Sequence, residues 1–286
     1  MTPKRYVLIV LLIITAIAGT NSADHKGIFQ AGVAVLTAIL CDGIVALFQG
    51  RKSLFSDSGI ITGLIVALVL SSSTPWYITA AATLIALVSK HLFKIQRRPV
   101  FNPAALGLLV AIFLFSSGQS WWGAFAELPV WTIAYLLVAG YLVTQRVNKF
   151  PQVLAFLGSY FLLLLIMGYF GTGHAGDALR PPFINCALFF AVFMVTDPPT
   201  SPAKYRDQIW FGIITAIVSA SIYLVFGGLA FLLIGLLFAN AFNALRVYAG
   251  STPKTNARRP MPGRMVSGNV NIQLRSAPKT DKGLRW

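Results

Sequence analysis

The chain has 286 residues, of which 56% are hydrophobic and only 11% are charged, and its mean hydropathy is +0.73. A typical soluble domain carries about 25% charged residues, so the composition excludes a water-soluble protein. It predicts an all-α, polytopic membrane protein. The formal net charge of +15 requires no nucleic-acid partner, because membrane topology explains where the basic residues lie.

Apolar stretches long enough to cross a hydrocarbon core of about 30 Å recur along the chain. They predict about ten transmembrane helices, near residues 6–20, 27–49, 59–71, 76–89, 103–117, 130–145, 151–170, 183–196, 209–225 and 228–247. Two of these segments, 59–71 and 183–196, are short, which is typical of re-entrant or broken helices. Tryptophans at the predicted span ends, Trp121 and Trp122 among them, are expected to anchor at the membrane interface.

Basic residues collect in cytoplasmic loops, and here they alternate along the chain as ten spans require. Of 23 Lys and Arg, only Lys26 and Arg180 fall on the opposite side. Both termini are therefore predicted to be cytoplasmic, in a bacterial inner membrane. The first segment also resembles a signal peptide, but its removal would leave the remaining helices without an anchor for their orientation, so we expect it to be retained.

Two short matches indicate an internal repeat within residues 1–250. Thr-Pro and Thr-Ser-Pro follow the third and eighth spans, and Phe-Asn occurs at the fifth and tenth. Halves of about 1–120 and 128–250, with five spans each, would enter the membrane in opposite directions, as in many transport folds. Residues 251–286 are basic and rich in Pro, Gly, Ser and Asn, which favours a disordered cytoplasmic tail.

Several prolines have a local role as helix starts. Pro at the first helical position loses no hydrogen bond, and a Thr, Ser or Asn just before it can cap the free amides. Pro75, Pro103 and Pro202 all fit this pattern. The last two lie beside basic residues on the cytoplasmic side, where exposed amides and cations favour an anion such as a phosphate.

Asp42 is a carboxylate within an otherwise apolar segment, which is costly unless it is paired, protonated or hydrated. It predicts a proton or cation contact, or support for a site; a structural hydrogen bond between helices is the alternative. Cys41 and Cys186 are intramembrane and are predicted to be packing residues. No His spacing indicates a metal site, and no nucleophile and base pair indicates a hydrolase.

Three stretches resemble the NqrB/RnfD family of membrane subunits of redox-driven ion pumps. They are DSGIITGLIVAL (57–68), FNPAALG (101–107) and FMVTDPPTSP (193–202), called here the first, second and third motifs. The resemblance implies an all-α bundle of about ten helices in two inverted halves, similar to the urea transporter fold. It also implies partners in a membrane redox complex, such as an extracytoplasmic flavin-carrying or iron-sulfur protein.

Members of that family carry FMN on the Thr of a Ser-Gly-Ala-Thr motif, which is missing here. Thr172 is the only threonine of the corresponding loop, and its neighbours do not match the motif, so covalent FMN is not expected. A noncovalent flavin, riboflavin or FMN, remains the implied cofactor, and the resemblance implies these neighbours for it: Thr62, Gly63, Asn102, Pro103, Thr196, Asp197 and Thr200.

The leading hypothesis is an electron-transfer subunit that passes electrons across the membrane through this flavin, with possible coupling to ion transport. Such a subunit is not expected to be catalytic alone. A channel or carrier for a small neutral solute is the alternative, because the same inverted fold serves transport. A third hypothesis is an assembly scaffold that has lost the cofactor.

Overall fold

The computed structural model describes residues 2–21, 25–50, 56–95, 98–126, 128–172, 175–228 and 230–251. Most of the predicted tail, 252–286, therefore lies outside the described residues. The first half contains α1 (Pro3–Asn21), α2 (Lys26–Phe48), α3 (Asp57–Val69), α4 (Trp76–Leu92), the two-residue strands β1 (Lys94–Ile95) and β2 (Arg98–Pro99), and α5 (Pro103–Phe115).

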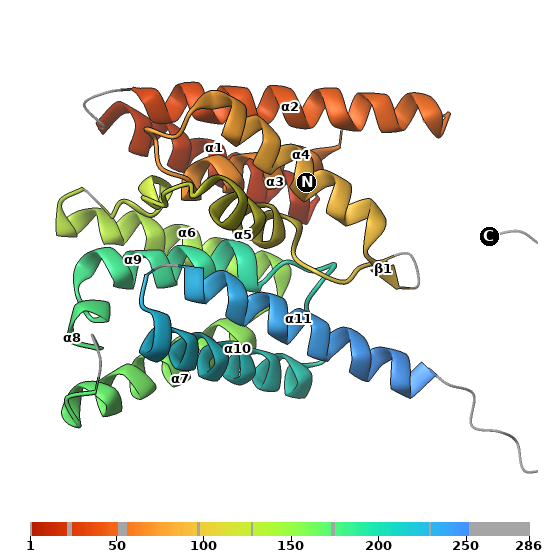
Figure 1. Cartoon of the computed structure of the whole chain (residues 1–286). Coiled ribbons are helices and arrows are strands. Elements are labelled where there is room, and N and C mark those ends of the chain that lie inside the picture. Colours follow the sequence, from red (N-terminus) through yellow and green to blue (C-terminus); the bar gives the residue numbers. More distant parts are fainter. Residues whose placement is uncertain are drawn as a thin grey trace, which may run out of the picture. The chain divides into compact units, whose positions relative to one another are not determined.

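The second half follows a connection that contains two short 3-10 helices, η1 (Trp122–Ala124) and η2 (Val130–Thr132). Its helices are α6 (Ile133–Val147), α7 (Phe150–Tyr169), α8 (Ala175–Ala178), α9 (Pro181–Phe190), the π-helix η3 (Ala191–Val195), α10 (Tyr205–Phe226) and α11 (Ala230–Ser251). The helices run roughly alongside one another (Figure 1), so the predicted all-α membrane protein is confirmed.

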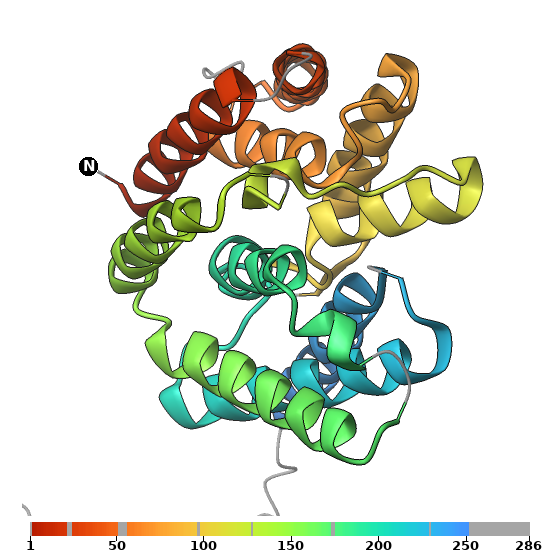
Figure 2. The same ribbon diagram turned by 90° about the vertical axis from the view of Figure 1, so that its left-hand side faces the viewer.

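Six of the described helical segments are long and apolar enough to cross a membrane: Pro3–Thr20, Lys26–Phe48, Val130–Val147, Phe150–Tyr169, Tyr205–Phe226 and Ala230–Ala249. Shorter apolar helices cover Asp57–Val69, Pro103–Phe115 and Pro181–Val195. At a rise of 1.5 Å per residue, a 13-residue helix such as α3 is only about 20 Å long. The two segments predicted to be short therefore are short helices, and both lie among the longer ones in the end-on view of Figure 2.

Irregular backbone packs inside the protein where α3 ends. The Trp121 amide donates to the carbonyl of Val69 at 3.1 Å, and the Trp122 indole donates to that of Ala67 at 2.7 Å. Both tryptophans are buried, at 0% and 7% exposure. The expectation that they anchor at the membrane interface is therefore wrong, because the Trp122 ring and the Trp121 main-chain amide instead supply donors to carbonyls at the end of a short helix.

Glycines bring neighbouring helices close. A Cβ at Gly107 would lie 2.5 Å from the carbonyl oxygen of Ala82, and one at Gly212 would lie 2.6 Å from that of Gln152. Small residues at such points allow the backbones of membrane helices to approach each other and pack. The pairs α4–α5 and α7–α10 meet at these positions.

Of the three prolines predicted to begin helices, one does so, Pro103 of α5. Asn102 caps α5 by accepting a hydrogen bond from the Ala105 amide at 3.0 Å, with Pro103 at the first helical position. However, α4 begins at Trp76, directly after Pro75, and α10 begins at Tyr205, three residues after Pro202. The residues around Pro202 instead form turns that return to Asp197.

Candidate functional site

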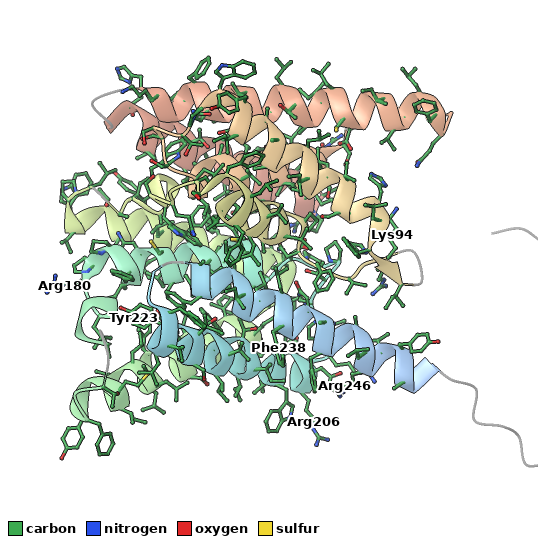
Figure 3. The ribbon with its side chains drawn as sticks, viewed as in Figure 1. Lys94, Arg180, Arg206, Tyr223, Phe238 and Arg246 are labelled. Carbon is green, nitrogen blue, oxygen red and sulfur yellow. The ribbon has the colours of Figure 1, made fainter. Side chains whose placement is uncertain are left out.

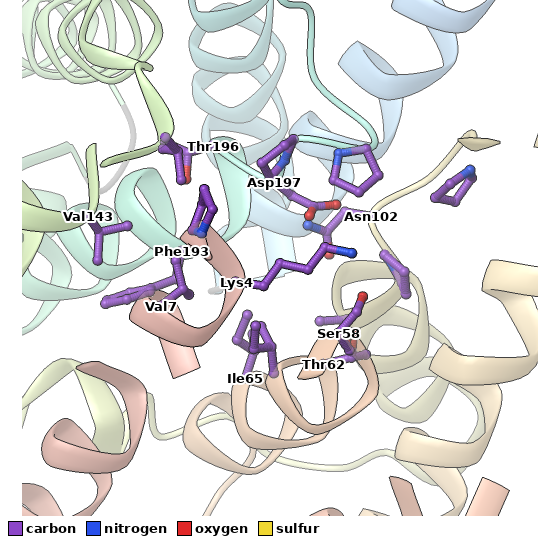
Figure 4. Close-up of a pocket in the computed structure, with 18 of the residues that line it drawn as sticks. Lys4, Val7, Ser58, Thr62, Ile65, Asn102, Val143, Phe193, Thr196 and Asp197 are labelled. Carbon is purple, nitrogen blue, oxygen red and sulfur yellow. Dashed lines mark hydrogen bonds between the residues drawn. The ribbon is translucent and has the colours of Figure 1, made fainter. Parts of the chain in front are cut away.

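The three motifs meet at one cleft. The first motif contributes Ser58 and Thr62 from α3, the second contributes Asn102 and Pro103 at the start of α5, and the third contributes residues at the end of η3. Apolar side chains form the rest of the walls, and Lys4 and Lys90 reach it from α1 and α4. Figure 4 shows Lys4 extending into the cleft, with Asn102 and Asp197 on one side and Ser58 and Thr62 on the other.

A broken helix lies at the centre of this site, since η3 ends at Val195 and leaves carbonyls without intrahelical partners. Asn102 donates its side-chain amide to the Met194 carbonyl at 3.1 Å, and Gln152 donates to that of Val195 at 2.7 Å. The Thr196 hydroxyl donates to the Val192 carbonyl. Side chains from α7 and from the start of α5 therefore replace the missing helical hydrogen bonds.

Asn240 of α11 joins the second and third motifs. Its side-chain oxygen accepts from the Asn102 backbone amide at 2.8 Å, while its amide group donates to the Thr200 carbonyl at 3.2 Å. Asn240 is fully buried, so both bonds form away from water, where an unmade bond would cost about 1–3 kcal/mol. This residue holds the start of α5 and the turn after η3 in a fixed relation.

The Asp197 carboxylate has one hydroxyl donor and the positive charges of three lysines near it. Its carboxylate accepts from the Thr200 hydroxyl at 2.9 Å. Although part of the residue faces the cleft, the carboxylate packs among protein atoms, and this burial raises the pKa of Asp197. The Thr200 hydrogen bond and the positive charges of Lys90, Lys4 and Lys149 oppose that rise and favour the carboxylate form.

Lys149 lies just before α7 and is 4% exposed. Its ammonium group donates to the carbonyl of Pro202. Burial lowers the pKa of Lys149 from near 10.5 to about 8, against the attraction of Asp197. This lysine therefore ties the turn after η3 to the start of α7.

Asp42 lies beside the cleft rather than in its wall. It is 9% exposed, and its Oδ2 atom has no hydrogen-bond partner among the described residues. A Cβ at Gly59 would overlap this carboxylate, so the glycine makes room for it. Asp42 attracts Lys90, whose ammonium donates to the Ser58 hydroxyl at 2.8 Å. Asp42 lies six residues before Phe48, the last residue of α2, and is therefore about 9 Å from that end of the helix.

The structure separates the seven residues predicted to surround a flavin into two groups. Five of them line the cleft: Thr62, Asn102, Pro103, Thr196 and Asp197. Gly63 does not line it, because this residue packs against α2, where a Cβ would lie 2.8 Å from the Ala34 carbonyl oxygen. Thr200 acts through its bond to Asp197 and lines a neighbouring cleft instead.

Sequence reasoning missed Lys4, Ser58, Lys90 and Lys149 as parts of this site. Along the sequence the lysines indicate only the cytoplasmic side, since a basic residue near a helix end is typical of topology. The position of Lys90 in the last turn of an apolar helix could have indicated a site residue. The side chain of such a lysine packs beside apolar turns that carry no water, so its ammonium group needs a polar partner within the protein. Thr172, the one Thr in the loop where that family carries its covalent FMN, is exposed and donates to the Met167 carbonyl at 2.9 Å.

Within the described part of the chain, no three His, Cys, Asp or Glu side chains lie close enough together to hold a metal ion. Cys41 and Cys186 are both free thiols, the first partly buried and the second buried. The cleft therefore offers hydroxyl, amide, ammonium and carboxylate groups around apolar walls. Mostly apolar walls with a few polar groups are typical of sites for small organic ligands.

Comparison with known proteins identifies relatives along most of the chain. The model of the NQR2, RnfD, RnfE family matches residues 3–127 and 125–248. The RnfD subunit of the ion-translocating oxidoreductase complex of Pseudomonas aeruginosa is 24% identical over 240 residues, covering 63% of this chain and 70% of that protein. The protein of the same name from Shewanella amazonensis is 23% identical over 272 residues, covering 70% and 77%.

Proposed function

The chain belongs to the NQR2, RnfD, RnfE family, and from that premise we propose that it is the integral membrane subunit of an ion-translocating electron-transport complex. In this proposal the cleft holds a flavin, riboflavin or FMN, without a covalent bond. Bound there, the flavin supplies one- and two-electron redox chemistry. The partners are other subunits of the complex, including an extracytoplasmic flavin-carrying or iron-sulfur protein.

One observation carries the proposal: the three motifs, separated by about 30 and 90 residues in sequence, line a single cleft. Each contributes at least one polar side chain to it, namely Thr62, Asn102 and Thr196. Each of these side chains also bonds within the protein, so the feature that helix packing alone does not require is that polar groups from three distant segments line one space.

The donor set of the cleft fits a flavin in its chemistry. Phe193 and Ile65 offer apolar surface for a ring system. Lys90 and the Asn102 amide group have donors for the ring nitrogens and carbonyls, and the Thr62 hydroxyl oxygen can accept a hydrogen bond, since its own hydrogen donates to Ser58. The space open to water in the cleft is about 80 Å³, whereas ligand pockets commonly hold about 300–1,000 Å³. Binding therefore requires the exposed Lys4 side chain, with the start of α1, to move away from the mouth.

In the same proposal, about ten spans form two inverted halves similar to the urea transporter fold. The short third span of each half, α3 in the first and α9–η3 in the second, supports this arrangement. We also propose that Asp42 contacts a proton or cation during turnover. Its Oδ2 atom has no hydrogen-bond partner among the described residues, and the carboxylate attracts Lys90. Both observations support that role, because a buried carboxylate oxygen without a hydrogen bond is costly to retain.

The test is to release and identify the cofactor. The full chain, purified in detergent from a membrane that contains its complex, should show flavin absorbance, and acid precipitation should leave the flavin in the supernatant. Thr62→Leu should lower the flavin content at least about tenfold, because the larger side chain fills the cleft. Thr37→Leu is the matched control, since both hydroxyls donate at 2.8 Å to the carbonyl four residues earlier and Thr37 lies outside the cleft.

A folded but colourless protein, with no redox signal in its complex, would contradict the proposal. Equal flavin content in the two Thr variants would place the flavin elsewhere. Uptake of a small neutral solute by vesicles that contain the protein alone would favour a channel or carrier instead.

A further inference from the structure

Exposed faces of the neighbouring helices α10 and α11 carry the same order of side chains along the helix axis. On α10, Arg206, Trp210 and Ile214 follow at intervals of four residues, and on α11 the order Arg246, Phe242, Phe238 does the same in reverse. Residues four apart lie on one helix face. Because the two helices run in opposite directions, both stripes progress from a cation through an aromatic ring to an apolar side chain over about 12 Å.

Six of the residues that line the cleft between these helices come from the two stripes and the turn before α10. The cleft has a volume of about 570 Å³ and is lined by Lys204, Arg206, Asp207, Trp210, Ile214, Phe242 and Arg246. Farther from the cations, α10 and α11 pack tightly against each other, since a Cβ at Gly235 would lie 2.9 Å from the Thr215 carbonyl oxygen. The cleft is therefore a groove that opens toward the end carrying the cations.

The charges of the groove do not cancel. Arg246 and Asp207 form an ion pair at 2.6 Å, which joins the two helices. Lys204 and Arg206 remain as two exposed cations on the same rim. Figure 3 shows Arg206 and Arg246 at the end of the bundle that also carries Lys94, with Arg180 toward the opposite end. This is the end that the distribution of basic residues predicts to be cytoplasmic.

The apolar part of the groove remains exposed. Trp210 is 51% exposed and Phe242 is 45% exposed, so large aromatic surface lies next to two cations with no protein cover from the described residues. A soluble ligand would leave this surface in contact with lipid or water. A ligand with an anionic head and an apolar tail would cover both parts in the order in which the groove presents them.

We propose that the groove between α10 and α11 binds an anionic phospholipid of the inner leaflet. Its phosphate contacts Lys204 and Arg206, and its acyl chains lie along Trp210, Ile214 and Phe242. Basic pockets between transmembrane helices on the cytoplasmic side suit such headgroups, and aromatic residues favour the level just below them. The site is separate from the motif cleft and does not depend on the proposed redox function.

The experiment measures lipid retention by the full chain. The detergent-purified protein is stripped of lipid, mixed with phosphatidylglycerol, cardiolipin or phosphatidylcholine, and observed by native mass spectrometry. The anionic lipids should bind at least about tenfold better than phosphatidylcholine. Lys204→Ala with Arg206→Ala should reduce their retention about thirtyfold, as expected for two surface cations, and Trp210→Ala should reduce retention of all three lipids.

Matched controls separate the groove from general surface charge. Lys94→Ala with Arg146→Ala removes one Lys and one Arg that are exposed outside the groove, and Trp76→Ala removes a tryptophan that is 58% exposed elsewhere. Neither control should change lipid retention. Thermal unfolding of every variant in the same detergent verifies that each is folded.

Three results would overturn the proposal. Equal retention by the groove variant and its control would show nonspecific attraction. Displacement of the lipid by millimolar inorganic phosphate would indicate a site for free anions. Unchanged lipid binding, together with loss of the purified complex in Lys204→Ala with Arg206→Ala, would assign the groove to a partner subunit.

Discussion

At the scale of the residue, Asn102 and Asn240 each satisfy backbone groups of two different segments of the chain. Asn102 caps its own helix α5 and donates to the end of η3, while Asn240 bonds to Asn102 and to Thr200. Amide side chains suit this task because each carries both an acceptor and two donors. The site around the cleft is consequently held by a small number of polar side chains.

Lys149 gives the protein a predictable dependence on pH. Its pKa is about 8 in the folded protein and near 10.5 otherwise, so between these values the unfolded state binds more protons and stability rises with pH. Below about pH 8, Lys149 is protonated in both the folded and the unfolded state, and the full cost of burying its charge lowers the free energy of unfolding. The Lys149→Met variant should lack this rise.

The measurement is the unfolding midpoint in detergent between pH 7 and 9.5 for the wild type, Lys149→Met and Lys94→Met. The exposed Lys94 variant should follow the wild-type profile. A parallel profile for Lys149→Met would contradict the assignment of the effect to this ammonium group.

At the scale of the element, the break at the end of η3 creates the site. A continuous helix through 196–202 would satisfy its own carbonyls and leave Asn102 and Gln152 without acceptors. The sequence TDPPTSP prevents this, because two successive prolines remove amides and disfavour the helical conformation of the preceding residue. The break thus leaves carbonyls that side chains of other helices can reach.

Packing of α7 against α10 depends on Gly212, where any side chain meets the backbone of Gln152. Gly212→Val should destabilise the protein by about 2 kcal/mol, within the range for overpacked sites, and lower its thermal midpoint in detergent. Gly158→Val on α7 is the control, because no atom lies within 4 Å of the position of its Cβ. Equal losses for the two variants would indicate that helix propensity, rather than the α7–α10 contact, sets the effect.

At the scale of the whole molecule, the charges predict one orientation. Lys94, Arg206 and Arg246 lie toward one end and Arg180 toward the other (Figure 3), which agrees with the alternation predicted along the sequence. Both stripes of the α10–α11 groove present their cations at the first of these ends. One orientation in the membrane thus satisfies the charge rule and the proposed lipid site together.

The orientation is testable with single cysteines in a Cys41→Ser, Cys186→Ser background. Thr172→Cys, at an exposed position, should react with an impermeant maleimide in intact spheroplasts. Arg206→Cys should react only after permeabilisation. The reverse pattern would show that both the termini and the groove face outward.

The class of protein, most of the helices and the family could all be predicted from the amino-acid sequence, and the family resemblance implied five of the residues that line the cleft. These predictions were possible because apolar length, basic loops and short motifs are local properties of the chain. Gly63 and Thr200, which the resemblance also gives as flavin neighbours, do not line the cleft, since neighbours in a motif can face different helices. Lys4, Lys90 and Lys149 join the site only in three dimensions, because no spacing along the chain records that their ammonium groups lie near Asp197.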